Sequence, residues 1–187
     1  GNTKISAKNA KGSVKILLAT IYYDHKTLRL SSFALYGTMV FMTATGHAVI
    51  GTVIAAKIGN PQLAVPLALA SHIAADAFPH WDEGTNGKKT KKRIAIEAVF
   101  DVLFGFAISY LIIFLLFPQT DLIYVFIMII VSQSFDWITA PYYFFGIKQF
   151  KIFYILQKSF NNEMKAPLGI INQVAILVLI VILTKIF

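Results

Sequence analysis

The sequence predicts an all-α protein, a multi-pass transmembrane bundle with four or five membrane helices. Two observations support this fold class. Of the 187 residues, 57% are hydrophobic and 14% are charged, whereas ordinary soluble domains carry about 25% charged residues. Several apolar runs also approach the roughly 20 residues that a helix needs to cross a bilayer.

Five apolar runs are the candidate membrane helices. In chain order they cover residues 44–58, 63–78, 94–117, 122–145 and 168–187. The first run contains His47, the second His72 and Asp76, the third Glu97 and Asp101, and the fourth Asp136, while the last is nearly free of charge. Ionisable groups inside a membrane segment are costly, so these residues are candidates for a functional site.

The basic residues indicate how the chain crosses the membrane. Five Lys and Arg residues lie at 88–93, directly before the third run, and four Lys residues lie at 148–165, after the fourth. The turn at 118–121 has none. By the positive-inside rule, both basic connections are cytoplasmic and the turn faces outward. We interpret the net charge of +8 as topology and contact with membrane lipids. The basic patches lack interleaved aromatic residues, so we expect no nucleic-acid partner.

This topology brings the polar residues of different runs toward one face of the membrane. At a rise of 1.5 Å per residue, residues such as His47, Asp76, Asp101 and Asp136 fall within about 15 Å of the cytoplasmic boundary. The topology uses only Lys and Arg, so the clustering is an independent result. The sequence therefore predicts one site near the cytoplasmic face.

The segment 71–82 carries the strongest chemical pattern, since it holds two of the four histidines and two carboxylates. A helix brings positions four residues apart onto one face, so His72 and Asp76 align. His80 and Asp82 follow at a helix end marked by proline. Imidazole and carboxylate groups together suit Zn, Mn or Fe. The chain has no cysteine, which excludes disulfides and thiolate ligands.

Several of these residues also have structural interpretations. Asp101 could hydrogen-bond a neighbouring helix, and Asp136 could be a polar anchor at the interface. Glu97 lies four residues after Arg93, the spacing of an ordinary helix-surface ion pair. His25 lies in a polar stretch far from the others, where we expect it to be solvated.

The segments 45–51 (TGHAVIG) and 71–82 (SHIAADAFPHWD) resemble the membrane-bound metal-dependent hydrolase family, the YdjM-like inner-membrane proteins of bacteria. The resemblance covers about residues 42–187 and implies a multi-pass protein of the bacterial cytoplasmic (inner) membrane with a bound divalent metal. The positions that it carries over are His47, His72, Asp76, His80 and Asp82. Members of this family tend to begin just before the His47 motif. We therefore expect residues 1–41 to be an appended leader, or a cytoplasmic or interfacial segment.

These observations predict hydrolysis of a membrane-embedded or lipid-linked ester, and the ester expected first is a phosphoester. The expected metal is Zn, with Mn or Fe as alternatives, and its expected ligands are His47, His72, Asp76, His80 and Asp136. The expected catalytic residues are Asp82 and Asp101. Two alternatives stay open: a transporter of protons or metal ions, and a non-catalytic membrane protein with a structural metal. The outer parts of the third and fourth runs, 107–117 and 122–131, are almost wholly apolar, which argues against a transport path.

Overall fold

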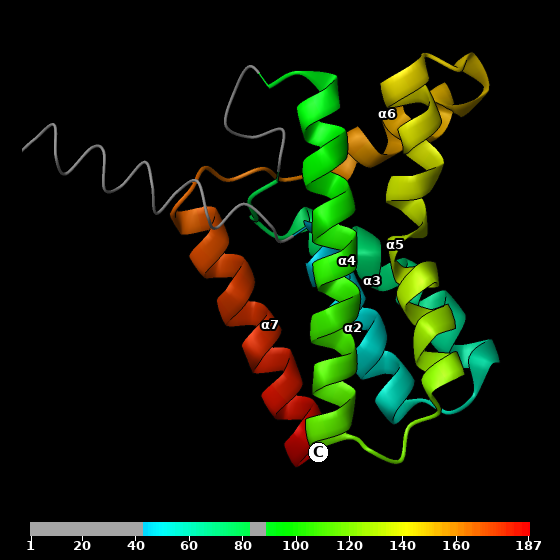
Figure 1. Ribbon diagram of the computed structural model, residues 1–187, viewed down its shortest axis with the longest axis vertical. Helices are drawn as coiled ribbons and strands as arrows, with labels where there is room; N and C mark the ends of the chain where they lie inside the picture. The colour runs from blue at the N-terminus through cyan, green and yellow to red at the C-terminus, as the bar shows by residue number, and fades with distance from the viewer. Residues whose placement is uncertain (1–42, 83–88) are drawn as a thin grey trace, which may run out of the picture. The chain divides into compact units, whose positions relative to one another are not determined.

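Each of the five apolar runs forms a helix. The structure, a computed structural model, describes residues 43–82 and 89–187. Its helices are α2 (Thr43–Lys57), α3 (Pro61–Ala77), α4 (Lys91–Leu116), α5 (Leu122–Phe145), the short 3₁₀ helix η1 (Lys148–Phe150), α6 (Lys151–Phe160) and α7 (Leu168–Ile186) (Figure 1). These residues contain no β-strand, so the all-α prediction is confirmed. The predicted leader at 1–41 and His25 lie outside the described residues.

Three of the described helices, α4, α5 and α7, are long and apolar enough to cross a membrane, which indicates a membrane protein. The predicted four or five spans are not confirmed, because only three of the described helices are long enough to cross a membrane. Helices α2 and α3 have 15 and 17 residues, and a helix of 15 residues is only about 22 Å long. The hydrocarbon core of a bilayer is about 30 Å thick. Both short helices therefore cover only part of that depth.

The ends of the helices follow from local sequence signals. Helix α3 begins at Pro61, and the Asn60 side chain accepts a hydrogen bond from the Gln62 amide. The Thr90 hydroxyl caps α4 in the same way, and the Asp121 carboxylate caps α5. These residue types are preferred at helix N-termini because their oxygens satisfy amides that have no partner within the helix.

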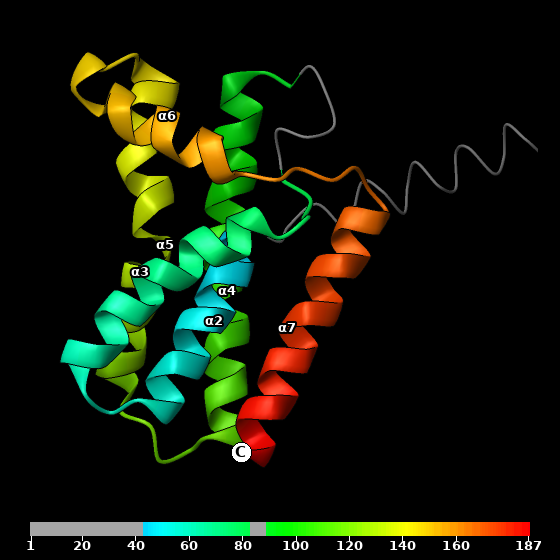
Figure 2. The ribbon, with the colours of Figure 1, turned by 180° about the vertical axis from the view of Figure 1, so that it is seen from behind.

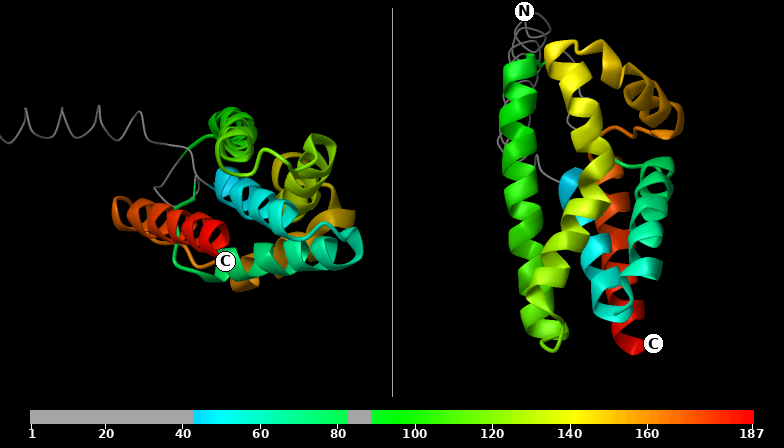
Figure 3. Two further views of the ribbon diagram at one scale, coloured as in Figure 1. Left: turned by 90° about the horizontal axis from the view of Figure 1, so that it is seen from below. Right: turned by 90° about the vertical axis from the view of Figure 1, so that its right-hand side faces the viewer.

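Helix α2 lies in the middle of the bundle and packs against α3, α4, α5 and α7 (Figure 3, left). Glycine allows two of these close approaches. A β-carbon at Gly51 of α2 would lie 2.6 Å from the Ser132 hydroxyl of α5, and one at Gly105 of α4 would lie 3.0 Å from the Cα atom of Thr45. Close backbone packing through small residues is typical of helices inside membranes. It explains how a short helix is enclosed by four others.

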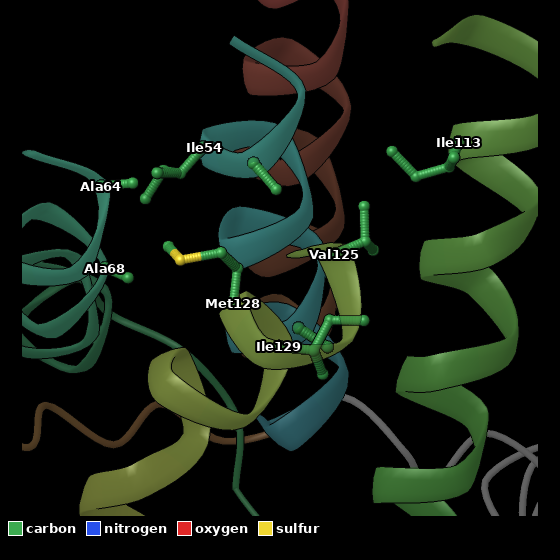
Figure 4. Packing of buried hydrophobic residues seen from close by; sticks show 9 residues of the cluster. Ile54, Ala64, Ala68, Ile113, Val125, Met128 and Ile129 are labelled. Carbon is green, nitrogen blue, oxygen red and sulfur yellow. The ribbon is translucent and has the colours of Figure 1, made fainter. Parts of the chain in front are cut away.

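The buried apolar core occupies one half of the bundle. Side chains from α2, α3, α4 and α5 meet there (Figure 4), and most of them come from the second half of α2, the first half of α3, the end of α4 and the first half of α5. Ile113, Val125, Met128 and Ile129 are fully buried in this core. It lies at the end of the bundle that carries the 118–121 turn. The buried ionisable residues of the described helices lie toward the opposite end.

Helix α6 was not predicted by the sequence analysis, which treated 146–167 as a basic connection. It packs against α5 and α3 and lies near the ends of α4 and α5 that the basic residues mark (Figure 2). The connection after α6 pairs with the segment after α3. The His80 amide donates to the Asn162 carbonyl at 3.2 Å, and the Met164 amide donates to the His80 carbonyl at 2.6 Å. The chain around His80 is thus held by residues more than 80 positions away.

Candidate metal site

Three helices bring two histidines and two carboxylates together. His47 lies in the first turns of α2, and Asp136 lies in the second half of α5. On α3 the buried residues are Ala64, Ala68, His72 and Asp76, which are four positions apart along one face. The two alanines allow α3 to pack closely against its neighbours, and the next two turns present the imidazole and the carboxylate. The prediction that His72 and Asp76 share a face is confirmed.

The Asp76 carboxylate bridges the two imidazoles. Its Oδ1 lies 3.0 Å from His47 Nε2, and its Oδ2 lies 3.4 Å from His72 Nε2. The two rings stack, with centroids 3.8 Å apart and an interplanar angle of 14°. Asp136 approaches from the α5 side, and its Oδ1 lies 3.7 Å from His72 Nε2. His72 is fully buried, His47 and Asp76 are buried, and only Asp136 is partly exposed, with 33% of its side chain accessible.

The hydrogen bonding of His72 leaves one nitrogen facing negative charge. His72 Nδ1 lies 2.6 Å from the carbonyl oxygen of Ser132, an oxygen that can only accept, so Nδ1 carries the proton. In the neutral ring, Nε2 then holds a lone pair. This atom is buried without a hydrogen-bond partner and faces Asp76 and Asp136 oxygens. A lone pair opposite two carboxylates is unfavourable unless a cation, either a proton or a metal ion, lies between them.

The residues present fit a metal ion. His47, His72 and Asp136 each offer one ligand atom, and these three atoms lie within 4.8 Å of one another. Asp76 Oδ2 faces His72 Nε2, the nitrogen that remains for a metal, so Asp76 could contribute a further ligand oxygen. The Ser132 carbonyl orients the His72 ring through its other nitrogen, Nδ1. The group His47–His72–Asp136, with Asp76 beside it, could therefore hold a metal ion.

His80 and Asp82 lie at the edge of this group. His80 is buried, and its Nδ1 lies 2.8 Å from the Phe78 carbonyl, which leaves Nε2 able to accept or to bind a metal. Asp82 is half-buried and accepts a hydrogen bond of 3.4 Å from the Asn161 amide. Neither residue belongs to the three-residue group above, although both line the cavity beside it.

Asp101 belongs to α4 and is fully buried against the start of α2, where its carboxylate caps that helix. Its Oδ2 accepts a hydrogen bond of 2.6 Å from the Ala44 amide, and its Oδ1 accepts one of 2.7 Å from the Thr45 hydroxyl. This is the contact with a neighbouring helix that the sequence analysis offered as an alternative to catalysis. Glu97 pairs with Arg93, Nε to Oε1, at 2.8 Å, which confirms the expected helix-surface pair. Lys89 adds a second ion pair at 2.6 Å.

Several residues around Asp136 were missed by the sequence analysis. Gln157 of α6 donates through Nε2 to Asp136 Oδ1 at 2.5 Å. The Thr139 hydroxyl lies 2.9 Å from Gln157 Oε1 and thereby fixes the orientation of the amide. One sequence signal was available, because Gln157 lies between the apolar positions of a short amphipathic pattern, Ile155–Leu156 and Phe160. Its partner on α5 could not be inferred from that pattern.

A cavity of about 730 Å³ lies beside the site. Its polar lining includes His47, Asp76, His80, Asp82, Asp101 and Asp136, and the seventh predicted site residue, His72, is fully buried beside them. Its apolar lining comes from the first half of α4 and the second half of α5. A smaller cavity of about 230 Å³ reaches His47, Asp76 and His80 from the α7 side. Cavities of several hundred Å³ with a few convergent polar groups are typical of ligand sites.

Basic residues lie at and near the larger cavity, which Lys158 lines. Lys158 of α6 lies 3.0 Å from Glu163 Oε1, and this hydrogen bond raises the pKa of the Lys158 ammonium group, so the group stays charged at physiological pH. Lys91, at the start of α4, donates through Nζ to the Tyr143 carbonyl near the end of α5 at 2.7 Å. This contact links the two helices at the basic end of the bundle.

Comparison with models of protein families, with curated proteins and with solved structures finds no match for this chain. The resemblance to the membrane-bound metal-dependent hydrolase family therefore stays a prediction from two short motifs. The geometry of the site itself is the basis for a functional proposal.

Proposed function

We propose that this protein is a membrane-embedded metal-dependent hydrolase that acts on a membrane-embedded or lipid-linked ester near the cytoplasmic face of a bacterial inner membrane. One observation carries the proposal: two buried imidazoles and a carboxylate converge within 4.8 Å of one another beside a cavity. His72 Nε2 faces two carboxylates with no hydrogen donor between them. A divalent cation would satisfy all of these groups together.

The residues of the site would take distinct roles. His47, His72 and Asp136 would hold the metal, and Asp76 would offer a further ligand oxygen beside them. The Ser132 carbonyl would orient the His72 ring through Nδ1. Gln157 would orient Asp136 through the hydrogen bond to Oδ1. A bound divalent metal supplies Lewis acidity, which lowers the pKa of water and polarises a phosphoryl or acyl oxygen. Asp82 lies at the cavity wall outside the metal-binding group, and its carboxyl group would be the one to move a proton.

The exposure of Asp136 gives the site an open side. His47, His72 and Asp76 are enclosed, whereas a third of the Asp136 side chain is accessible from the cavity. Catalytic metal sites keep such an open position, while structural sites are closed by protein ligands on all sides. This feature favours hydrolysis over a purely structural metal.

Transport of protons or metal ions is the weaker alternative. A transport path needs polar groups reachable from both faces of the membrane. In the described helices, the half of the bundle beyond the site is filled by the apolar core around Ile113, Val125, Met128 and Ile129, all fully buried. This packing supports a site that is reached from one side.

Metal content of the purified protein tests the proposal. We expect about one equivalent of Zn or Mn in the wild type and loss of most of it in Asp136→Asn, because the amide carries no charge and is a poor metal ligand. Asp121→Asn is the matched control: the same change on the same helix, at the capping position of its other end. Elemental analysis of detergent-purified samples, with thermal unfolding to confirm folding, provides the readout. A wild type that stays metal-free after titration with Zn and Mn would overturn the hydrolase proposal.

A further inference from the structure

The large cavity opens sideways, between α4 and α5. Three of its lining residues have large exposed fractions: Val99 at 59%, Leu103 at 60% and Trp137 at 41%. Side chains that line a cavity and are exposed to this extent lie where the cavity is open. The mouth is therefore formed by apolar side chains of two helices that are long and apolar enough to span a membrane. Figure 3, right, shows these two helices side by side.

The surface around this mouth faces lipid if α4 and α5 cross the bilayer. On the adjoining face of α4, Phe100, Phe104 and Leu111 are also exposed, at 57%, 46% and 50%. Exposed aromatic and aliphatic side chains of this density would be a liability in water. The mouth thus opens toward acyl chains, and a ligand with a hydrocarbon chain reaches it without leaving the membrane.

The cavity changes character along its length. Ala95, Ala98 and Val102 of α4 and Ala140 of α5 form apolar walls, and the small residues among them leave room for a chain. His47 contributes to the polar end, where it is 95% buried and its Nδ1 has no hydrogen-bond partner. An apolar slot that ends at polar groups matches an amphiphile whose head lies at the site and whose tail lies between the helices.

Two ammonium groups near the cavity would interact favourably with a phosphate head once a divalent cation offsets the carboxylates of the site. Lys91 bridges α4 and α5 through Tyr143, and Lys158 lies at the cavity wall beside its ion-pair partner Glu163. At 1.5 Å per residue, Asp136 lies about 10 Å along α5 from Tyr143. The head of a lipid at the site would therefore lie between these two ammonium groups and the imidazoles. The carboxylates of the site oppose an anion, and a bound divalent cation would offset them.

We propose that the slot between α4 and α5 binds one hydrocarbon chain of a phosphate-headed membrane lipid that enters sideways from the bilayer. This inference rests on the proposed function only for the chemistry at the head group. The binding of the chain is independent of turnover.

Trp137 at the mouth provides a direct test by fluorescence. The chain has two tryptophans, and Trp81 is 2% exposed, so a Trp81→Phe background leaves Trp137 as the reporter. In bilayers of phosphatidylcholine, increasing fractions of phosphatidic acid with dibrominated chains quench a nearby tryptophan by contact. We expect quenching that saturates at a low mole fraction and is reversed by excess unbrominated phosphatidic acid. Brominated phosphatidylcholine should require at least a tenfold higher fraction.

Two blocking variants and one control complete the experiment. Ala98→Phe and Ala140→Phe fill the slot from opposite walls, so each should raise the half-saturating fraction at least tenfold. Leu111→Phe, on the lipid-facing surface of α4 outside the cavity, should leave it unchanged. Each protein is used only if it elutes as a single species and unfolds at the temperature of its parent.

The outcomes separate this inference from the proposed function. Quenching that rises in proportion to the brominated fraction, or equal curves for Ala98→Phe and Leu111→Phe, would overturn the slot even if metal is bound. Equal affinity for phosphatidylcholine and phosphatidic acid would overturn the phosphate head. Saturable, slot-dependent quenching in a protein that binds no metal would support the slot while overturning the hydrolase.

Discussion

The Asp101 carboxylate of α4 stabilises the start of α2. Its contact with Thr45 lies two residues before His47, which belongs to the site. The carboxylate accepts hydrogen bonds from the Ala44 amide and the Thr45 hydroxyl, and it is fully buried. Amides in the first turn of a helix have no partner within the helix, and a negative charge there also interacts favourably with the helix dipole. Asp101 therefore positions the helix that carries His47.

Replacing Asp101 by alanine should lower the free energy of unfolding by about 2–3 kcal/mol, because buried donors lose a charged acceptor. Asp101→Asn keeps an oxygen acceptor and should recover about half of this loss. Thermal unfolding in detergent measures both effects. Metal content should stay near the wild-type value in Asp101→Asn. A variant with wild-type stability and strongly reduced hydrolysis would instead support the catalytic role predicted from the sequence.

At the residue scale, the sequence identified most ionisable groups of the site but not their partners. Asp76 and Asp136 stand out because a charge inside an apolar run is rare. The Ser132 carbonyl that orients His72 belongs to the backbone, and no residue type marks it. Asp101 and Asp136 look alike in the sequence, as single carboxylates in apolar runs. Only packing against α2 and α6 distinguishes the cap from the candidate ligand.

Among the elements, α6 combines an exposed apolar face with a contact to the site. Ile152, Ile155 and Leu156 form an exposed apolar face, while Gln157 points inward to Asp136. A short amphipathic helix flanked by lysines is typical of segments that lie in the membrane interface. Its position thereby controls one hydrogen bond to a candidate metal ligand.

Gln157→Leu should weaken metal binding by about 10–100-fold, the range typical for the loss of a hydrogen bond that orients a ligand. Gln149→Leu makes the same change at an exposed position of η1 and serves as the control. Competition with a chromophoric chelator measures both affinities for Zn. If the two variants bind Zn equally well, Gln157 does not orient Asp136.

The helices themselves were largely predictable, and the exceptions have physical reasons. Runs of apolar residues between proline, glycine and charged residues marked both ends of α5 and α7 to within one residue, and those of α4 to within three. Helix α6 was missed because ten residues cannot span a bilayer and its lysines indicated a loop. Helices α2 and α3 were found, but their depth in the bundle depends on close packing at Gly51, which sequence alone does not reveal.

The described bundle is asymmetric along its helices. One half holds the apolar core, and the other holds the buried histidines and carboxylates together with α6 and most of the described lysines. The positive-inside rule predicts that the basic end faces the cytoplasm. This predicted orientation would decide which pool of metal ions, water and lipid the site meets.

Single introduced cysteines can test the orientation without labelling of native cysteines, because the chain contains no cysteine. Thr120→Cys lies in the turn between α4 and α5, and Lys151→Cys lies at the start of α6. In intact cells, a membrane-impermeant maleimide should label Cys at 120 and not at 151. After permeabilisation both should react to the same extent, which controls for local accessibility.

The opposite labelling pattern would have a specific consequence. The site and its cavity would then face the outside, Lys91 and Lys158 would lie at the outer leaflet, and the cytoplasmic metal pool could not load the protein directly. The slot between α4 and α5 would still open into the bilayer, because its mouth depends on helix packing and not on orientation. Labelling of both positions in intact cells would contradict the prediction that α4 and α5 cross the membrane on either side of the turn. The experiment therefore tests the membrane topology separately from the site and from the slot.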